Sequence, residues 1–180
     1  TKTKIVDFYP AFRFGFQLPI HFGNNYFSKD LSSGFGFHST LSLVKIYNFR
    51  LSLGYEFQKL KVENSNAIGN FDYINSNSYQ YILEYEIPLN SKLELNPTIS
   101  YGQCQFNYKE NTGRSILAEQ SLEEIRLGSY INYNLNKTFA GYAGLHFSHF
   151  YNSNLNASPE NKDYFGKGNK FILSLGILIH

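Results

Sequence analysis

The sequence predicts an all-β protein: an eight-stranded antiparallel transmembrane β-barrel of the bacterial outer membrane, formed as one domain over residues 1–180. Three observations lead to this prediction. Apolar and polar residues alternate with a period of two through most of the chain, which is typical of strands with two different faces. Phe and Tyr contribute 17 and 15 residues, and aromatic residues are frequent where strands meet lipid and its headgroups. Short and long connections also alternate.

Eight segments carry the alternating pattern. In the first, Phe12, Phe14 and Phe16 alternate with polar or small residues, and in the third the alternation runs from Phe49 to Gln58. Positions two apart share one face of a strand, so each segment has an apolar face and a polar one. We expect strands near residues 4–18, 33–46, 49–62, 77–88, 92–108, 121–135, 138–150 and 168–179.

Two of the later expected strands have distinctive patterns. The last one has a continuous apolar ridge from Phe171 to Ile179, whereas in the fifth the pattern slips, since Cys104 and Phe106 have the opposite parity to Tyr101. A β-bulge would explain that slip. Proline cannot donate a hydrogen bond to a ladder, so further bulges or strand ends are expected at three positions. These are Pro10, Pro88 and Pro97.

The connections indicate how the barrel is oriented. Short ones are expected near residues 47–48, 89–91 and 136–137, and long polar ones near 19–32, 63–76, 109–120 and 151–167. Outer-membrane barrels have an even number of strands, short periplasmic turns and longer outer loops. Both chain ends are therefore expected on the periplasmic side. The start of the chain has no charged-then-apolar leader, so we interpret it as a mature sequence.

A soluble eight-stranded barrel, such as a lipocalin, is the alternative fold. It would turn the apolar face inward around a ligand. In the membrane arrangement, the acids and arginines of the polar faces could pair inside a narrow barrel. In the soluble arrangement, the many aromatic rings would have to fit into that narrow interior. The membrane arrangement is therefore favoured. The charged residues in question are Arg13, Arg50, Glu56, Glu84, Glu86, Glu94, Glu124 and Arg126.

Composition excludes several classes of function. A formal net charge of +2 and no basic cluster give no reason to expect a nucleic-acid partner. The single cysteine, Cys104, excludes an internal disulfide. His21, His38 and His180 are isolated in the sequence, so we expect neither a metal site nor a cofactor.

One local group of residues could support chemistry. His146 and Ser148 are two apart on the seventh expected strand, and Glu160 follows in the next loop. A neighbouring imidazole can take the proton of a serine hydroxyl, and a carboxylate can orient that imidazole. These three residue types therefore form a candidate catalytic triad.

This arrangement resembles the outer-membrane lipid A 3-O-deacylases of the PagL type, which are eight-stranded barrels with a late His-x-Ser pair and a Glu fourteen residues after the His. The resemblance covers about twenty residues. It implies a cofactor-free serine esterase that removes the 3-linked acyl chain of lipid A in the outer leaflet. Ser148 would be the nucleophile, His146 the general base and Glu160 the orienting group.

The resemblance also implies residues that support the oxyanion. Asn156 matches a family Asn ten residues after the His, and His149 stands where the family has Asn directly after the serine. The family's site opens toward lipid. In this strand the odd face, with Leu145 and Phe147, is slightly more apolar than the even face that carries His146 and Ser148. Whether the pair faces lipid or lumen is therefore left open.

A non-enzymatic barrel is the alternative function. It would be a structural or accessory subunit of a larger outer-membrane complex, and would need only the fold and long polar loops. Its partners would be membrane lipids and other outer-membrane proteins, while the esterase would bind lipid A or lipopolysaccharide.

Overall fold

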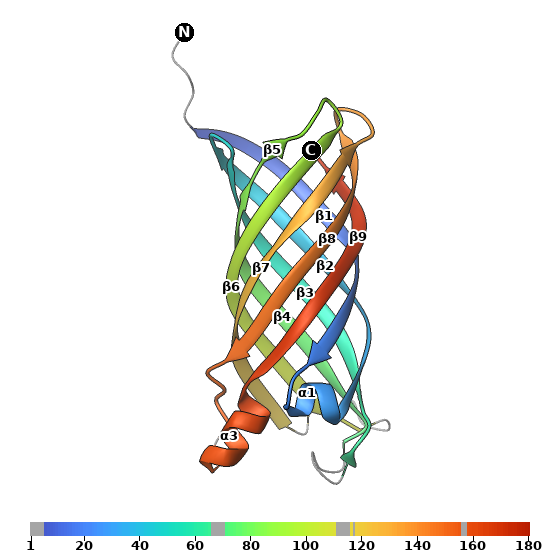
Figure 1. Cartoon of the computed structure of the whole chain (residues 1–180), viewed down its shortest axis with the longest axis vertical. Coiled ribbons are helices and arrows are strands. Elements are labelled where there is room, and N and C mark those ends of the chain that lie inside the picture. The colour runs from blue at the N-terminus through green and yellow to red at the C-terminus, as the bar shows by residue number, and fades with distance from the viewer. Residues whose placement is uncertain (1–5, 66–70, 111–115, 117, 156–157) are drawn as a thin grey trace.

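The computed structural model describes residues 6–65, 71–110, 116, 118–155 and 158–180. Within these residues the chain is almost entirely strand, with two helices at one end (Figure 1). The strands are β1 (Val6–Phe22), β2 (Leu31–Ile46), β3 (Phe49–Val62), β4 (Tyr73–Tyr85), β5 (Ile87–Pro88), β6 (Leu93–Lys109), β7 (Ala118–Asn134), β8 (Phe139–Tyr151) and β9 (Gly168–Ile179). The helices are α1 (Tyr26–Lys29) and α3 (Pro159–Gly166).

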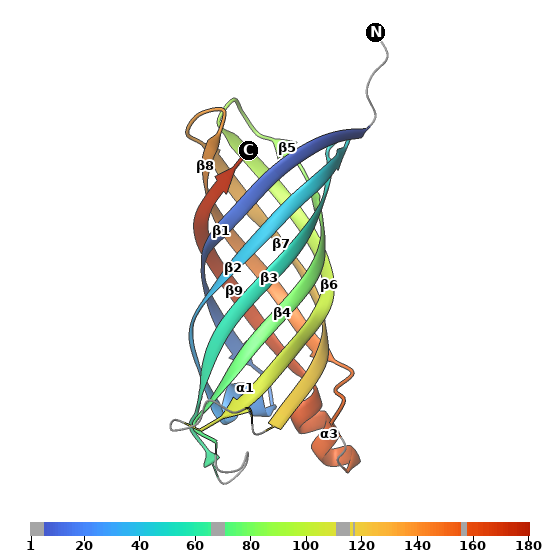
Figure 2. The ribbon, with the colours of Figure 1, turned by 180° about the vertical axis from the view of Figure 1, so that it is seen from behind.

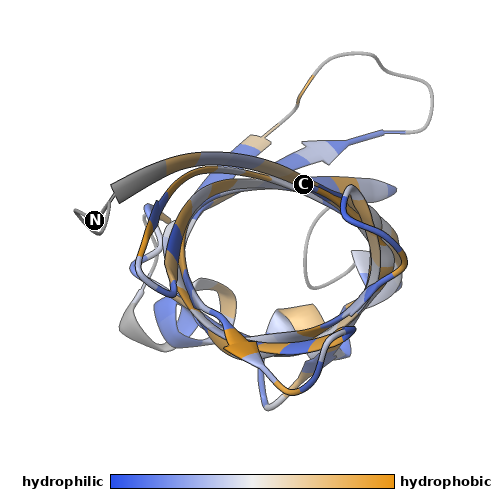
Figure 3. Cartoon of the chain, turned by 90° about the horizontal axis from the view of Figure 1, so that it is seen from above, coloured by the Kyte–Doolittle hydropathy of each residue, from blue (hydrophilic) through white to orange (hydrophobic). Residues whose placement is uncertain are grey.

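The strands form one closed antiparallel barrel. Their order is β4-β3-β2-β1-β9-β8-β7-β6-β5, and pairing of β4 with β6 closes the ring (Figures 2 and 3). The two-residue β5 continues β4 after an interruption at Glu86 and pairs with the same neighbour, β6. Counted as one, β4 and β5 leave eight strands. The expected eight-stranded antiparallel barrel is confirmed.

The two ends of the barrel differ. At the end that we call the turn end, short connections join β2 to β3, β5 to β6 and β7 to β8, and β9 terminates there (Figure 1). At the opposite end, the loop end, lie α1, α3 and the longer connections. The alternation of short and long connections is therefore as expected.

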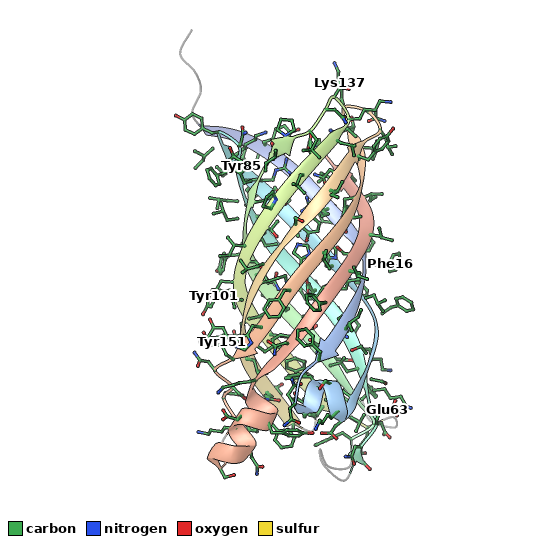
Figure 4. The ribbon with its side chains drawn as sticks, viewed as in Figure 1. Phe16, Glu63, Tyr85, Tyr101, Lys137 and Tyr151 are labelled. Carbon is green, nitrogen blue, oxygen red and sulfur yellow. The ribbon has the colours of Figure 1, made fainter. Side chains whose placement is uncertain are left out.

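The side chains follow the predicted division between outer wall and interior. Outside, Phe16 is 66% exposed and Tyr81 is 72% exposed, while inside, Arg50 and Glu84 are each only 1% exposed. Figure 4 shows Phe16 projecting from the wall, with Tyr85 nearer the turn end and Tyr151 nearer the loop end. Apolar walls flanked by aromatic residues are typical of membrane barrels. The soluble alternative, with its rings inside, is excluded.

The expected irregularities are found at two of three prolines. The β1–β2 pairing shifts register between Phe8 and Ala11, next to Pro10, and β5 ends at Pro88. Pro97 lies within the β6–β7 ladder, which passes it without a shift. On its other side Pro97 faces the interruption between β4 and β5, where β6 needs no donor.

The prediction of a bulge near Cys104 is wrong. β6 pairs in continuous register with β4 and with β7 through this residue. The slip arises because the interior itself becomes apolar toward the loop end, so Cys104, Phe106 and Tyr108 point inward like the polar residues before them. No helix in the described part of the chain is long and apolar enough to cross a membrane.

Candidate functional site

The middle of the lumen holds a group of four charged side chains, which we call the central cluster: Glu56, Glu124, Arg126 and Lys170. The Arg126 guanidinium donates to both carboxylates, with Nη2 at 2.8 Å from Glu56 Oε2 and 2.8 Å from Glu124 Oε1. Lys170 Nζ lies 3.2 Å from Glu124 Oε1. Each is at most 7% exposed. Two cations and two anions balance within the cluster, so their charges compensate one another away from water.

A second group lies nearer the turn end, and we call it the turn-side cluster: Arg13, Lys45, Arg50, Glu84 and Glu86. Glu84 accepts from two arginines, Arg13 Nη1 at 3.0 Å and Arg50 Nη1 at 3.2 Å. Glu86 accepts from Arg50 and Lys45. Glu84 and Glu86 therefore each meet two cations, so this part of the lumen also carries paired charges.

Four ring-bearing residues separate the two clusters, and we call them the aromatic layer: His38, Tyr130, Tyr142 and His146. Arg13 of the turn-side cluster lies 3.8 Å from the centroid of the Tyr130 ring, a distance typical of a cation–π contact. The Tyr142 hydroxyl and His38 Nε2 are 2.8 Å apart. The aromatic layer is therefore held together by its own ring contacts and contacts the turn-side cluster through Arg13.

Ser148 belongs to this interior. Its side chain is fully buried, and its hydroxyl donates a hydrogen bond to Glu124 Oε1 of the central cluster. The carboxylate also accepts a hydrogen bond from Arg126 and forms an ion pair with Lys170. Ser148 therefore faces the lumen and is held by a carboxylate of the neighbouring strand β7.

His146 also faces the lumen, on the same face of β8. It is 3% exposed, and its ring packs on Tyr130 with centroids 4.5 Å apart. Among the contacts of these two described side chains, no hydrogen bond joins His146 to Ser148. The structure thus places the pair on one face, as expected from the spacing, and assigns each a different neighbour.

The other predicted site residues lie elsewhere. Only the backbone of Glu160 is described, in the first turn of α3 at the loop end. Asn156 lies outside the described residues. His149 points to the outer wall, where its Nδ1 lies 2.8 Å from Asn169 Oδ1 and its ring stacks on Tyr151. His149 and Ser148 are therefore on opposite faces of β8.

Between the central cluster and the loop end, an apolar group closes the lumen. We call it the plug: Tyr26, Phe27, Leu31, Leu60, Ile74, Cys104, Phe106, Tyr108, Leu122 and Phe150. Tyr26 and Phe27 come from α1, which starts at an Asn25 cap whose side chain accepts from Ser28 N. Both are fully buried. The short helix therefore turns two aromatic rings into the mouth of the barrel.

Hydrogen bonds hold the plug to the strands. Gln120 Oε1 accepts from the Tyr26 hydroxyl at 3.0 Å and the Tyr108 hydroxyl at 2.7 Å. Outside it, the Tyr164 hydroxyl of α3 donates to Asp30 Oδ2 at 2.6 Å. The plug was not predicted from the sequence, although the adjacent aromatics Tyr26 and Phe27 in an otherwise polar stretch were a signal. Within the described residues, no three His, Cys, Asp or Glu side chains converge as metal ligands.

Comparison with known proteins gives matches of structure only. No family model and no curated protein sequence matches the chain. Among solved structures, Neisserial surface protein A superposes with a TM-score of 0.68 at 12% identity, covering 97% of each chain. A major outer membrane protein from Thermus thermophilus gives 0.57 at 12%, covering 94% of this chain and 98% of that one. The N-terminal β-barrel domain of Pseudomonas aeruginosa OprF gives 0.50 at 14%, covering 94% and 96%.

These identities are low, so the likeness concerns the fold. Together with the apolar wall and the polar lumen, it identifies the chain as an eight-stranded β-barrel of the bacterial outer membrane. Outer-membrane barrels have short periplasmic turns and longer outer loops, and by that general rule the turn end corresponds to the periplasmic end.

Proposed function

We propose that this chain is a non-enzymatic outer-membrane barrel that acts through its outer surface and loops, as a structural or accessory subunit of a larger outer-membrane assembly. The observation that carries the proposal is the filled lumen. From the turn end outward, it contains the turn-side cluster, the aromatic layer, the central cluster and the plug. This succession favours neither a diffusion channel nor an active site.

The surroundings of Ser148 support the same proposal. A serine nucleophile needs a neighbouring base that can accept its proton. Here the hydroxyl donates to Glu124, which is already paired with two cations, while His146 packs on Tyr130. In addition, an acyl ester in the outer leaflet lies beyond the wall that separates lipid from this serine. Ser148 is best explained as a structural member of the central cluster.

The lipid A deacylase hypothesis stays a prediction. It rests on the residue types and spacing of His146, Ser148 and Glu160, and on the shared face of the first two. For it to hold, β8 would have to present Ser148 to lipid, with the imidazole beside the hydroxyl.

An activity assay separates the two functions. Folded protein is incubated with lipopolysaccharide, and the lipid A is examined by mass spectrometry for loss of one 3-hydroxyacyl group. We expect unchanged lipid from the wild type. Loss of the acyl group with wild type, and not with Ser148→Ala, would overturn the proposal and establish the esterase.

The same variant has a second readout. If Ser148 is structural, Ser148→Ala removes a hydrogen bond to a buried carboxylate and lowers the free energy of unfolding by about 2 kcal/mol. Ser129 provides the matched control, because it lies on β7 at an outward, half-buried position. Ser129→Ala is expected to leave stability nearly unchanged. Equal stability of the two variants would argue against the structural role.

A further inference from the structure

A second feature lies on the outside of the barrel, where β2, β3 and β4 reach the loop end. There the surface is hollowed into a groove of about 630 Å³. We call it the loop-end groove. The lining residues that matter here are Ser32, Phe35, Lys59, Lys61, Asp72 and Tyr73. It is separate from the lumen, since its lysines occupy outward positions of β3.

The groove lies where the apolar wall ends. Along β3 the outward positions run through Leu51, Leu53 and Phe57, and then change to Lys59 and Lys61. Glu63 follows directly and is found at the loop end in Figure 4. Side chains at the end of the apolar band meet the headgroups of the outer leaflet. The groove is thus at the depth where a lipid changes from acyl chain to headgroup.

A bulge supplies the apolar side of the groove. The β2–β3 pairing shifts register between Ser33 and Gly36. Bulges re-aim side chains at barrel rims, and here Phe35 points away from the wall and is 78% exposed, the highest value among the described large hydrophobic residues. A phenyl ring next to two lysines suits a ligand with an apolar and an anionic part.

The charges of the groove are balanced. Lys59 Nζ lies 4.0 Å from the centroid of the Tyr73 ring, and Lys61 Nζ lies 3.3 Å from Glu63 Oε1, with both partners largely exposed. Hydrogen bonds from Ser32 and Lys61 hold the pKa of Glu63 below its ordinary value, so this carboxylate is ionised at neutral pH. Asp72 adds a second carboxylate to the lining.

This balance restricts the ligand. A simple anion would meet two carboxylates as well as two ammonium groups. A headgroup with both phosphate and hydroxyl groups would use all of them, because ammonium groups pair with phosphate while carboxylates accept hydrogen bonds from sugar hydroxyls. Aromatic side chains such as Tyr73 also offer an apolar face to a sugar ring.

We propose that the loop-end groove binds the phosphorylated sugar headgroup of an outer-leaflet glycolipid. Lys59 and Lys61 contact the phosphate, Glu63 and Asp72 accept from sugar hydroxyls, and Phe35 lies along the acyl chains. The site does not depend on the proposed function, since a glycolipid can be bound there by an enzyme or by a structural barrel alike.

Native mass spectrometry of the folded full chain in detergent tests this site. The probes are diphosphorylated lipid A, the same lipid A after removal of its phosphates, and phosphatidylglycerol. We expect the wild type to retain diphosphorylated lipid A at least about tenfold better than the dephosphorylated form. Phosphatidylglycerol, which carries phosphate without a sugar ring, is expected to bind more weakly than lipid A.

Variants locate the binding. Lys59→Gln with Lys61→Gln is expected to weaken lipid A binding about tenfold or more, since each lysine near an anionic surface contributes about 1 kcal/mol. The matched control is Lys92→Gln with Lys137→Gln, two exposed lysines at the turn end, which should bind as wild type does. Circular dichroism checks that each variant is folded.

Two results would overturn the proposal. Equal loss of binding in the groove variant and the turn-end variant would indicate general charge attraction. Equal retention of phosphatidylglycerol and lipid A would assign the groove to phospholipid. Either result leaves the deacylation assay unaffected, so this site and the proposed function can fail separately.

Discussion

The two halves of the lumen are built on opposite principles. In the half that contains the turn-side and central clusters, the interior carries charged and polar side chains together with the aromatic layer, and the outer positions are apolar. At the loop end the relation reverses, because the plug fills the inside with apolar side chains while outer positions such as Lys59 and Glu63 are charged. The same strands, with the same alternation, pass through both regions.

This reversal shows what can be inferred from the period-two pattern. Alternation reports that the two faces of a strand differ, and it does not say which face is inside. Within the membrane, lipid decides that the apolar face is outward. Beyond the membrane, water lies outside, and the apolar side chains turn inward as they do in a soluble protein. The boundary between the regions is therefore the level at which the membrane ends.

Removing a cation from the charged region is expected to have the largest effect. Arg126→Met leaves Glu56 and Glu124 with Lys170 as their remaining cation in the central cluster. Breaking a buried ion pair by removing one partner costs about 4 kcal/mol. Urea unfolding of the barrel in lipid vesicles, followed by circular dichroism, measures the change. A loss below about 1 kcal/mol would mean that water solvates the lumen.

An exposed ion pair provides the control for this variant. Lys167 Nζ lies 2.7 Å from Asp163 Oδ1 in the α3 region, where both side chains are more than half exposed. Lys167→Met should change stability by less than about 1 kcal/mol. The contrast between Arg126 and Lys167 then isolates the effect of burial.

Truncating the plug is expected to have the next largest effect. Phe27 is fully buried and packs on Phe106 and Phe150, with ring centroids 5.0 Å and 5.3 Å away. Phe27→Ala should lower the free energy of unfolding by about 3 kcal/mol, because it leaves a cavity in an apolar core. Phe35→Ala, at an outward and exposed position, is the control. If both variants lose the same amount, the plug is not a packed core.

The sequence predicted the barrel better than it predicted the interior. Period two and connection length depend on local residues, so the eight strands and the register shift beside Pro10 could be anticipated. The plug could not be anticipated from local pattern, because α1 meets β6 and β7 only after the barrel closes. Because α1 was not anticipated, the inward parity of Cys104 and Phe106 was interpreted as a bulge.

The candidate triad shows the same limit. Spacing correctly put His146 and Ser148 on one face of β8. The group that holds Ser148 is Glu124, which lies 24 residues away in sequence on β7 and comes opposite through strand pairing. A contact that is made through strand pairing cannot be predicted from the spacing of residues along one strand. The slightly more apolar odd face of β8 was a weak signal that the pair points inward.

The smallest expected effect concerns the exposed ion pair of Lys61 and Glu63, which joins a cation and a carboxylate outside the barrel as the clusters do in the lumen. Their side chains are 71% and 48% exposed. Coupling between such exposed charges is screened by water and ions, so a double-mutant cycle with Lys61→Gln and Glu63→Gln should give less than about 0.5 kcal/mol. A coupling above about 2 kcal/mol would show that the groove is shielded from solvent. It would then extend the low-dielectric region beyond the wall and shift the boundary between the two halves outward.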